Sequence, residues 1–237
     1  MRPLPRGRTR LTNSVMPFQL RDNIHWCVCA GRAVFLDLEA DRYFCLPKEA
    51  NDTFLRLATC NSSPADTGEL QALLARELLI DVDGDGSVRT PPSIEAPLHD
   101  LLSEPFPRIR PIQLVRALAC ELRAAWLLRT RPLLEVLASA ARHGSGERPM
   151  PQELDHSLPA IVAASNAIAL VTRVHNRCLV RALALPALCK SRGIRPKLVF
   201  GVIAHPFAAH CWVQLGTAVL VGGAEQARLY TPILVIE

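Results

Sequence analysis

The stretch of residues 177–216, RCLVRALALPALCKSRGIRPKLVFGVIAHPFAAHCWVQLG, decides the fold. Its first part, residues 177–192, carries Leu and Ala at helical spacing, and Gly193 follows at a position typical of a helix end. After Gly193 the hydrophobic period changes from about 3.6 to 2, which predicts strands over 197–204 and 209–215. A helix followed by adjacent strands predicts an α+β fold with an antiparallel sheet.

The sequence around this stretch extends the same pattern. Leu and Ala recur at helical spacing over 112–128, 132–142 and 158–174, which predicts three earlier helices. Further strands are predicted over 218–221 and 231–236. Six prolines lie within residues 91–111, where they remove backbone donors and oppose regular helices. We therefore expect a Pro-rich linker over 91–111 and a domain over 112–237.

The N-terminal part of the sequence has a different residue pattern. Short β-rich runs separated by turn residues predict strands over 24–29, 33–38 and 42–46. Pro47 then suits the start of a helix over 48–58, and a second helix is predicted over 67–80. We expect residues 21–90 to form a small domain of three strands plus helices, preceded by a flexible basic arm over 1–20.

Composition excludes several classes of protein. Apolar residues make up 49% of the 237 residues and charged residues 21%, which excludes wholesale disorder. The net charge is 27 − 22 = +5, and four basic residues lie in the first ten positions, so no basic face for nucleic acid is expected. The longest apolar stretches, 161–171 and 198–204, are too short to cross a bilayer of about 30 Å. We expect a cytoplasmic protein that binds neither membrane nor nucleic acid.

The sequence predicts neither a metal site nor a bound cofactor. The eight cysteines include no C-x-x-C pair, and Cys27 and Cys29 alone make a poor zinc site, so free thiols are expected. Residues 81–86, DVDGDG, match the first half of a calcium loop. The twelfth position of such a loop needs a bidentate Glu, but here it is Pro92, so an acidic turn is the better interpretation.

Two residues in the central stretch predict nucleophilic chemistry. Asn176 suits an N-cap, which places Cys178 in the first turn of a helix, where the macrodipole favours a thiolate. His210 follows on a predicted strand, in the arrangement of papain-like and transglutaminase-like sites. Cys189 and Cys211 are alternative nucleophiles, although Cys189 lies at the wrong end of the helix dipole. An inert core cysteine and a structural histidine remain alternatives.

Three segments carry a resemblance to a known family. Residues 178–194, 197–216 and 231–236 contain a Cys-Leu-Val-Arg helix start, a Gly-Ile helix end, Pro-Phe-x-Ala-His-x-Trp-Val and a closing Pro-Ile-Leu-Val. They resemble the C-terminal part of lasso-peptide B proteins, the leader peptidases of the transglutaminase-like superfamily. The resemblance covers residues 112–237 and implies a transglutaminase-like, papain-like cysteine peptidase domain.

The resemblance implies a set of catalytic residues with one departure. Cys178 is the implied nucleophile and His210 the implied general base, while the family's Asp aligns with Gly222. Three groups are alternatives for the third member of the catalytic set. They are a side chain from Glu225, a glycine carbonyl that accepts from Nδ1–H, and a water molecule. Loss of that acid weakens such chemistry without abolishing it.

The N-terminal unit resembles the winged-helix-like recognition element of peptide-modifying systems. A leader peptide is expected to pair with the free edge of the strand over 42–46 and to lie against the second helix. The residues expected to bind it are Arg42, Tyr43, Phe44, Leu46, Leu70 and Leu74. The alternative is that Tyr43 and Phe44 fill the core, as strand alternation requires of one of them.

The resemblance implies removal of the leader from a ribosomally made lasso precursor. An ATP-dependent cyclase, the expected partner besides the precursor, would then close the macrolactam on the freed amine. Two alternatives stay open: a non-catalytic scaffold that presents the precursor to another enzyme, and acyl transfer to an amine of the transglutaminase type.

Overall fold

The computed structural model describes residues 18–59, 77–81, 88–101, 107–142, 157–171, 177–190 and 192–237, and also positions 68, 71 and 73. Contacts divide the chain into two compact units, which are described separately. One unit comprises Met1–Asp22 and Pro47–Thr90, and the other comprises Asn23–Leu46 and Pro91–Glu237. The predicted α+β class is confirmed, because described helices and antiparallel strands occur together in the second unit.

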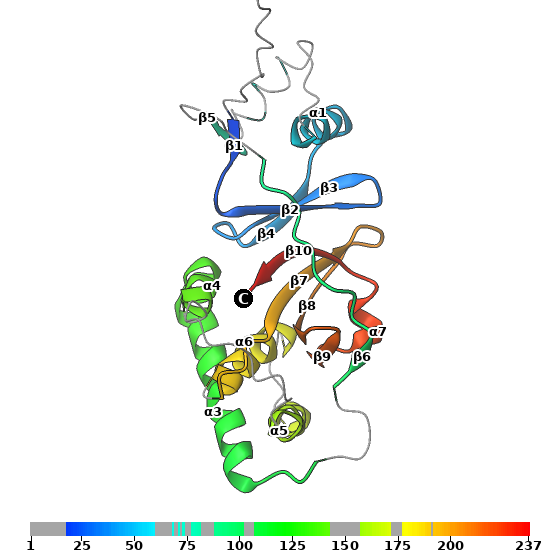
Figure 1. The fold of residues 1–237 in the computed structure, drawn as a ribbon. Helices are drawn as coiled ribbons and strands as arrows, with labels where there is room; N and C mark the ends of the chain where they lie inside the picture. Colours follow the sequence, from blue (N-terminus) through cyan, green and yellow to red (C-terminus); the bar gives the residue numbers. More distant parts are fainter. Residues whose placement is uncertain are drawn as a thin grey trace, which may run out of the picture. The chain divides into compact units, whose positions relative to one another are not determined.

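A five-stranded sheet forms the centre of the second unit (Figure 1). Its strand order is β10 (Thr231–Ile236), β7 (Lys197–Ile203), β8 (Ala208–Leu215), β9 (Ala218–Val221) and β6 (His99–Asp100). Neighbouring strands are antiparallel except for the edge pair β6–β9, which is parallel. The four predicted C-terminal strands are therefore confirmed.

The edge strand β6 was not predicted from the sequence. It lies within the expected linker over 91–111, and its neighbours bond to the sheet: the Leu98 N–H donates to the Thr217 carbonyl at 2.8 Å and the Leu101 N–H to the Val219 carbonyl at 2.9 Å. Proline excludes a helix here but does not exclude a short edge strand between prolines. This part of the Pro-rich segment is thus built into the sheet.

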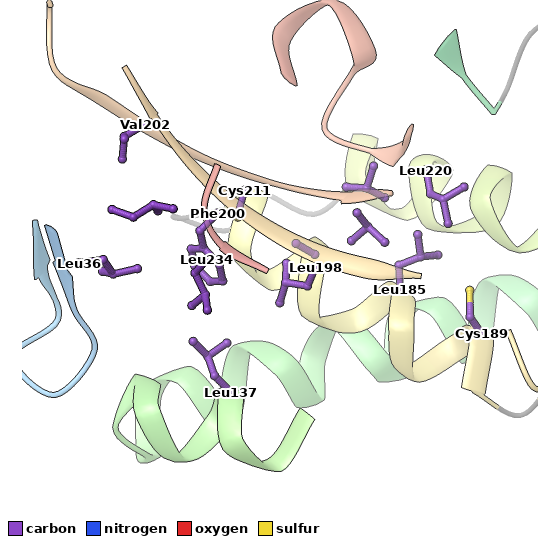
Figure 2. Packing of buried hydrophobic residues seen from close by; sticks show 14 of the residues in the cluster. Leu36, Leu137, Leu185, Cys189, Leu198, Phe200, Val202, Cys211, Leu220 and Leu234 are labelled. Carbon is purple, nitrogen blue, oxygen red and sulfur yellow. The ribbon is translucent and has the colours of Figure 1, made fainter. Parts of the chain in front are cut away.

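Helices cover the sheet of the second unit from one side (Figure 1). They are α3 (Pro111–Thr130), α4 (Leu133–Arg142), α5 (Leu158–Val171) and α6 (Arg177–Lys190), which confirms the predicted helices. On α6, Leu185 is fully buried among strand residues such as Leu198 (Figure 2). Gly193, at φ +73°, ends α6 as predicted, with the Ile194 N–H donating to the Cys189 carbonyl.

A three-stranded sheet also belongs to the second unit. Its order is β2 (Ile24–Cys29), β3 (Arg32–Asp37) and β4 (Arg42–Cys45), which confirms the predicted strands. One face of this sheet, including Val34 and Leu36, shares a buried cluster with Phe200 and Leu234 of the large sheet (Figure 2). The contacts therefore group these strands with the C-terminal residues, unlike the expected boundaries at 21–90 and 112–237. These strands group with the C-terminal residues because the apolar face of the three-stranded sheet is buried against them.

The first unit contains the short sheet β1 (Phe18–Leu20) with β5 (Leu79–Asp81), and helix α1 (Lys48–Ala58). Helix α1 has the predicted bounds. The second helix was predicted to reach residue 80, and this is wrong: Leu79 pairs with Leu20 in a strand, after Glu77 turns the chain with φ +55°. The expected arm over 1–20 likewise ends in a strand, because Leu20 is buried by this pairing.

Candidate active site

Helix α6 places the Cys178 thiol at its N-terminal end. Cys178 is the second residue of the helix and is half-buried. The first-turn N–H groups of a helix have no acceptor within it, and the macrodipole adds positive potential there. Both effects favour a thiolate at this position, as the sequence predicted. The expected N-cap, Asn176, lies outside the described residues.

Two neighbours on β8 hydrogen-bond the Cys178 sulfur. The Cys211 side chain is the strongest influence and the His210 side chain the second, and the Cys211 backbone contributes as well. Because these bonds stabilise the charged form, they lower the pKa of Cys178 from 9.0 to about 4, although partial burial opposes the change. Cys178 is therefore a thiolate at neutral pH and lies in contact with an imidazole.

The other two cysteines considered as nucleophiles lie in environments that disfavour a thiolate. Cys189 is fully buried, and burial raises its pKa to about 12. The pKa of Cys211 is also raised, first by its hydrogen bond to Cys178 and then by burial. On a regular strand, alternation points the Cys211 side chain away from that of His210, yet both side chains hydrogen-bond the Cys178 sulfur. These contacts depend on where α6 packs against β8, which no local pattern encodes.

A backbone carbonyl faces the second nitrogen of His210. Nε2 lies 3.2 Å from the oxygen of Gly222, and a carbonyl can only accept, so Nε2–H donates. Of the three alternatives for the third member, the structure shows the glycine carbonyl, but the bond uses Nε2 and not the expected Nδ1. Nδ1 is then the nitrogen left for the thiol. Glu225 is exposed in the first turn of the short helix α7 (Ala224–Ala227).

Gly222 occupies a place where no side chain fits. Its φ is +116°, and an added Cβ would lie 2.5 Å from the Trp212 Cβ and 3.2 Å from the His210 Nε2. A side chain such as the expected Asp therefore has no room at this position. The backbone reaches the imidazole here only because the residue is a glycine.

The strand register leaves the Gly222 carbonyl available. Leu215 pairs with Ala218 across a two-residue turn, and a bulge then shifts the register so that Val213 pairs with Val221. The pairing of β8 with β9 ends there. The next residue, Gly222, lies beyond the ladder, so its carbonyl can turn toward His210.

Two aromatic rings lie beside the His210 imidazole. The Trp212 ring stacks at 6.2 Å and the Tyr230 ring lies at 5.3 Å, measured between centroids. The buried Trp212 is fixed in turn, because its Nε1–H donates to the Gln214 Oε1 at 3.0 Å. The Gln214 amide donates to the carbonyls of Glu95 and Gly216. Strand alternation puts Trp212 and Gln214 on the same face of β8 as His210, but nothing in the sequence points to Tyr230.

The residues predicted to bind a leader divide between the two faces of β4. Phe44 stacks on Phe35 with centroids 5.0 Å apart, and the Arg42 guanidinium lies 5.7 Å above the Phe44 ring. Tyr43 packs on the other face, against the cluster that contains Cys211. Leu46 is buried. Leu70 and Leu74, also predicted to bind, lie outside the described residues.

Among the residues that the structure describes, no group of three His, Cys, Asp or Glu side chains could hold a metal ion. The cysteines in this part of the chain are free thiols, while Cys60 falls outside it. None of the described helices has the length and apolar character that a membrane crossing requires.

Comparison with known proteins gives one match, which covers the site. The model of the family described as the transglutaminase-like superfamily matches residues 118–235, a range that includes Cys178, His210 and Gly222. Searches of curated proteins and of solved structures found no match to the chain. The chain therefore carries a domain of the transglutaminase-like superfamily over 118–235, and the Cys178–His210 contact lies within it.

Proposed function

We propose that the protein is a cysteine peptidase that removes the leader from a ribosomally made lasso precursor. The observation that carries the proposal is the hydrogen bond between the side chains of Cys178 and His210, at the N-terminal end of α6. A thiolate beside an imidazole is the arrangement that nucleophilic acyl chemistry requires. The resemblance to lasso-peptide B proteins supplies the substrate class.

The reaction follows from the positions of these groups. The Cys178 sulfur attacks the carbonyl carbon at the leader–core junction, and the amine leaves with a proton from His210. Water, activated by the same imidazole, then hydrolyses the thioester. The Gly222 carbonyl orients the imidazole. Because a carbonyl carries no net charge, we expect it to stabilise the imidazolium less than the family's carboxylate, and turnover to be correspondingly slow.

Strand β4 supports the leader-binding part of the proposal. It is an edge strand of the three-stranded sheet, so its outer backbone groups can pair with an extended peptide. It also belongs to the unit that holds Cys178. A leader held at this edge would raise the local concentration of the scissile bond. An ATP-dependent cyclase would then use the freed amine.

Mass spectrometry of the precursor mixed with the protein tests the proposed reaction. The precursor for this assay is sought among the short reading frames beside the gene. Free leader and free core demonstrate hydrolysis, and this is the expected result. An adduct with an added amine would indicate acyl transfer instead, and an unchanged precursor that binds saturably would indicate a scaffold. If labelled leader does not bind the protein saturably, the leader-recognition part of the proposal is wrong.

Two cysteine variants test which thiol attacks. Cys178→Ala is expected to abolish cleavage because it removes the sulfur. Cys211→Ala keeps that sulfur, the His210 contact and the backbone donor at position 211, so cleavage is expected to persist at a reduced rate. Loss of cleavage in Cys211→Ala alone would show that the assignment of the nucleophile is wrong.

A further inference from the structure

The side of helix α3 that faces away from α5 and α6 carries a row of exposed apolar side chains. Helix α3 packs against these two helices, and its buried side is formed by Ala117, Glu121 and Ala124. The opposite side carries large apolar residues that are 37–62% exposed, here called the α3 stripe: Ile112, Val115, Leu118, Leu122 and Trp126. Single exposed apolar residues are ordinary on a protein surface, whereas a row of them marks a contact surface.

The spacing of the α3 stripe is that of one seam of a coiled coil. Positions 112, 115, 119, 122 and 126 follow one another at alternate steps of three and four residues, which are the a and d positions of a heptad. Ala119, which completes this series, is exposed as well. The stripe therefore presents the pattern that a further helix covers.

The charged side chains exposed on α3 are all positive. Arg116 and Arg123 follow Val115 and Leu122 directly, at heptad position e beside the stripe. Within the described residues neither guanidinium forms an ion pair, and the one acidic residue of α3, Glu121, is buried. The stripe is therefore complementary to carboxylates, which arginine binds through two parallel hydrogen bonds.

The spacing and the charge together select one kind of occupant. A second copy of this chain would bring the same arginines and no exposed carboxylate on α3, so like charges would face each other across the seam. An anionic membrane matches the charge but does not require heptad spacing, which is a pattern of packing between helices. A single helix of opposite charge satisfies both features.

We propose that the α3 stripe is a docking surface for an acidic amphipathic helix of a partner protein. The apolar side of that helix covers the stripe, with the exposed Trp126 as its main contact, because tryptophan is enriched among the residues that dominate binding. Its carboxylates pair with Arg116 and Arg123. The inference does not depend on the proposed cleavage reaction, since Cys178 and His210 take no part in it.

Tryptophan fluorescence of the full chain measures this binding. Trp126 is exposed whereas Trp26 and Trp212 are buried, so a change in emission on binding reports Trp126. The probe is a synthetic helical peptide with Leu at heptad positions a and d and Glu at e and g, and its matched control has Lys at e and g. A saturable blue shift with the Glu peptide, and weaker binding of the Lys peptide, are the expected results.

Variants of the full chain locate the binding. Leu122→Glu puts a carboxylate into the stripe and should weaken binding of the Glu peptide at least about tenfold. Leu229→Glu makes the same change at an exposed leucine outside α3 and should leave the affinity unchanged. Arg116→Glu combined with Arg123→Glu should reverse the preference, so that the Lys peptide binds more tightly than the Glu peptide.

Any of three outcomes would overturn the proposal. The first is the absence of a saturable shift with the Glu peptide, or an equal affinity for both peptides before and after the charge reversal. The second is tighter binding to phosphatidylglycerol vesicles than to the Glu peptide, which would assign the stripe to a membrane surface. The third is a dimer in sedimentation velocity that Leu122→Glu dissociates, which would assign the stripe to a second copy of the chain.

Discussion

At the scale of single residues, hydrogen bonds to the sulfur set Cys178 apart from the other cysteines. They favour the charged form and lower its pKa to about 4, so the thiolate persists well below neutral pH. We expect the rate of Cys178 alkylation by iodoacetamide to stay level as the pH falls from neutral and to halve near pH 4. Rates are read by mass spectrometry of the labelled peptide.

A matched variant checks the cause of this shift. Cys211→Ala removes the side chain that lowers the pKa of Cys178 most, so the midpoint of the alkylation profile should move to higher pH. A profile of the unmodified chain that halves near the free-cysteine value, about 8.5, would contradict the assigned contacts.

Gly222 makes a second prediction at the residue scale. In Gly222→Ala the new Cβ would lie 2.5 Å from the Trp212 Cβ at φ +116°, so both strain and overpacking apply. Together they are expected to cost about 3 kcal/mol in the free energy of unfolding. Gly216→Ala is the control: its φ is +57°, but the nearest atom is 3.8 Å away, and about 1 kcal/mol is expected. Equal urea midpoints for the two variants would refute the close approach.

At the scale of elements, helix α6 matters because its buried side holds Cys178 in place. Leu185 on this helix is fully buried, and Leu185→Ala is expected to cost about 2–5 kcal/mol in the free energy of unfolding. Leu170 on α5 is 86% exposed, so the same substitution there should cost less than about 0.5 kcal/mol. Urea denaturation compares the two, and a similar loss in both would show that α6 does not pack as described.

At the scale of the whole molecule, the second unit is assembled from two separate parts of the sequence. Strands β2–β4 bury one face in the same cluster as β7 and β10. A fragment of residues 91–237 should therefore expose that cluster and lose cooperative unfolding, whereas the full chain retains it. Near-ultraviolet circular dichroism during denaturation measures this. A fragment that unfolds cooperatively at the midpoint of the full chain would support the domain boundary expected from the prolines.

Local patterns in the sequence were sufficient for most helices and strands. The period of 3.6 predicted α3 to α6, the period of 2 predicted β7 to β10, and Gly193 marked the end of α6. These features depend on neighbours in the sequence, which is why the sequence alone determined them. The pairing of Cys178 with His210 was expected from the family resemblance, because a local pattern places each residue on its element but not the two elements against each other.

Packing between distant segments decided the rest. The β1–β5 pair, the edge strand β6 and the place of β2–β4 beside β10 each join residues far apart in the chain. The carbonyl of Gly222 at His210 and the thiol of Cys211 at Cys178 arise in the same way. Side-chain periodicity shows which face of an element is apolar but not which partner buries it, so only the tertiary structure could decide these contacts.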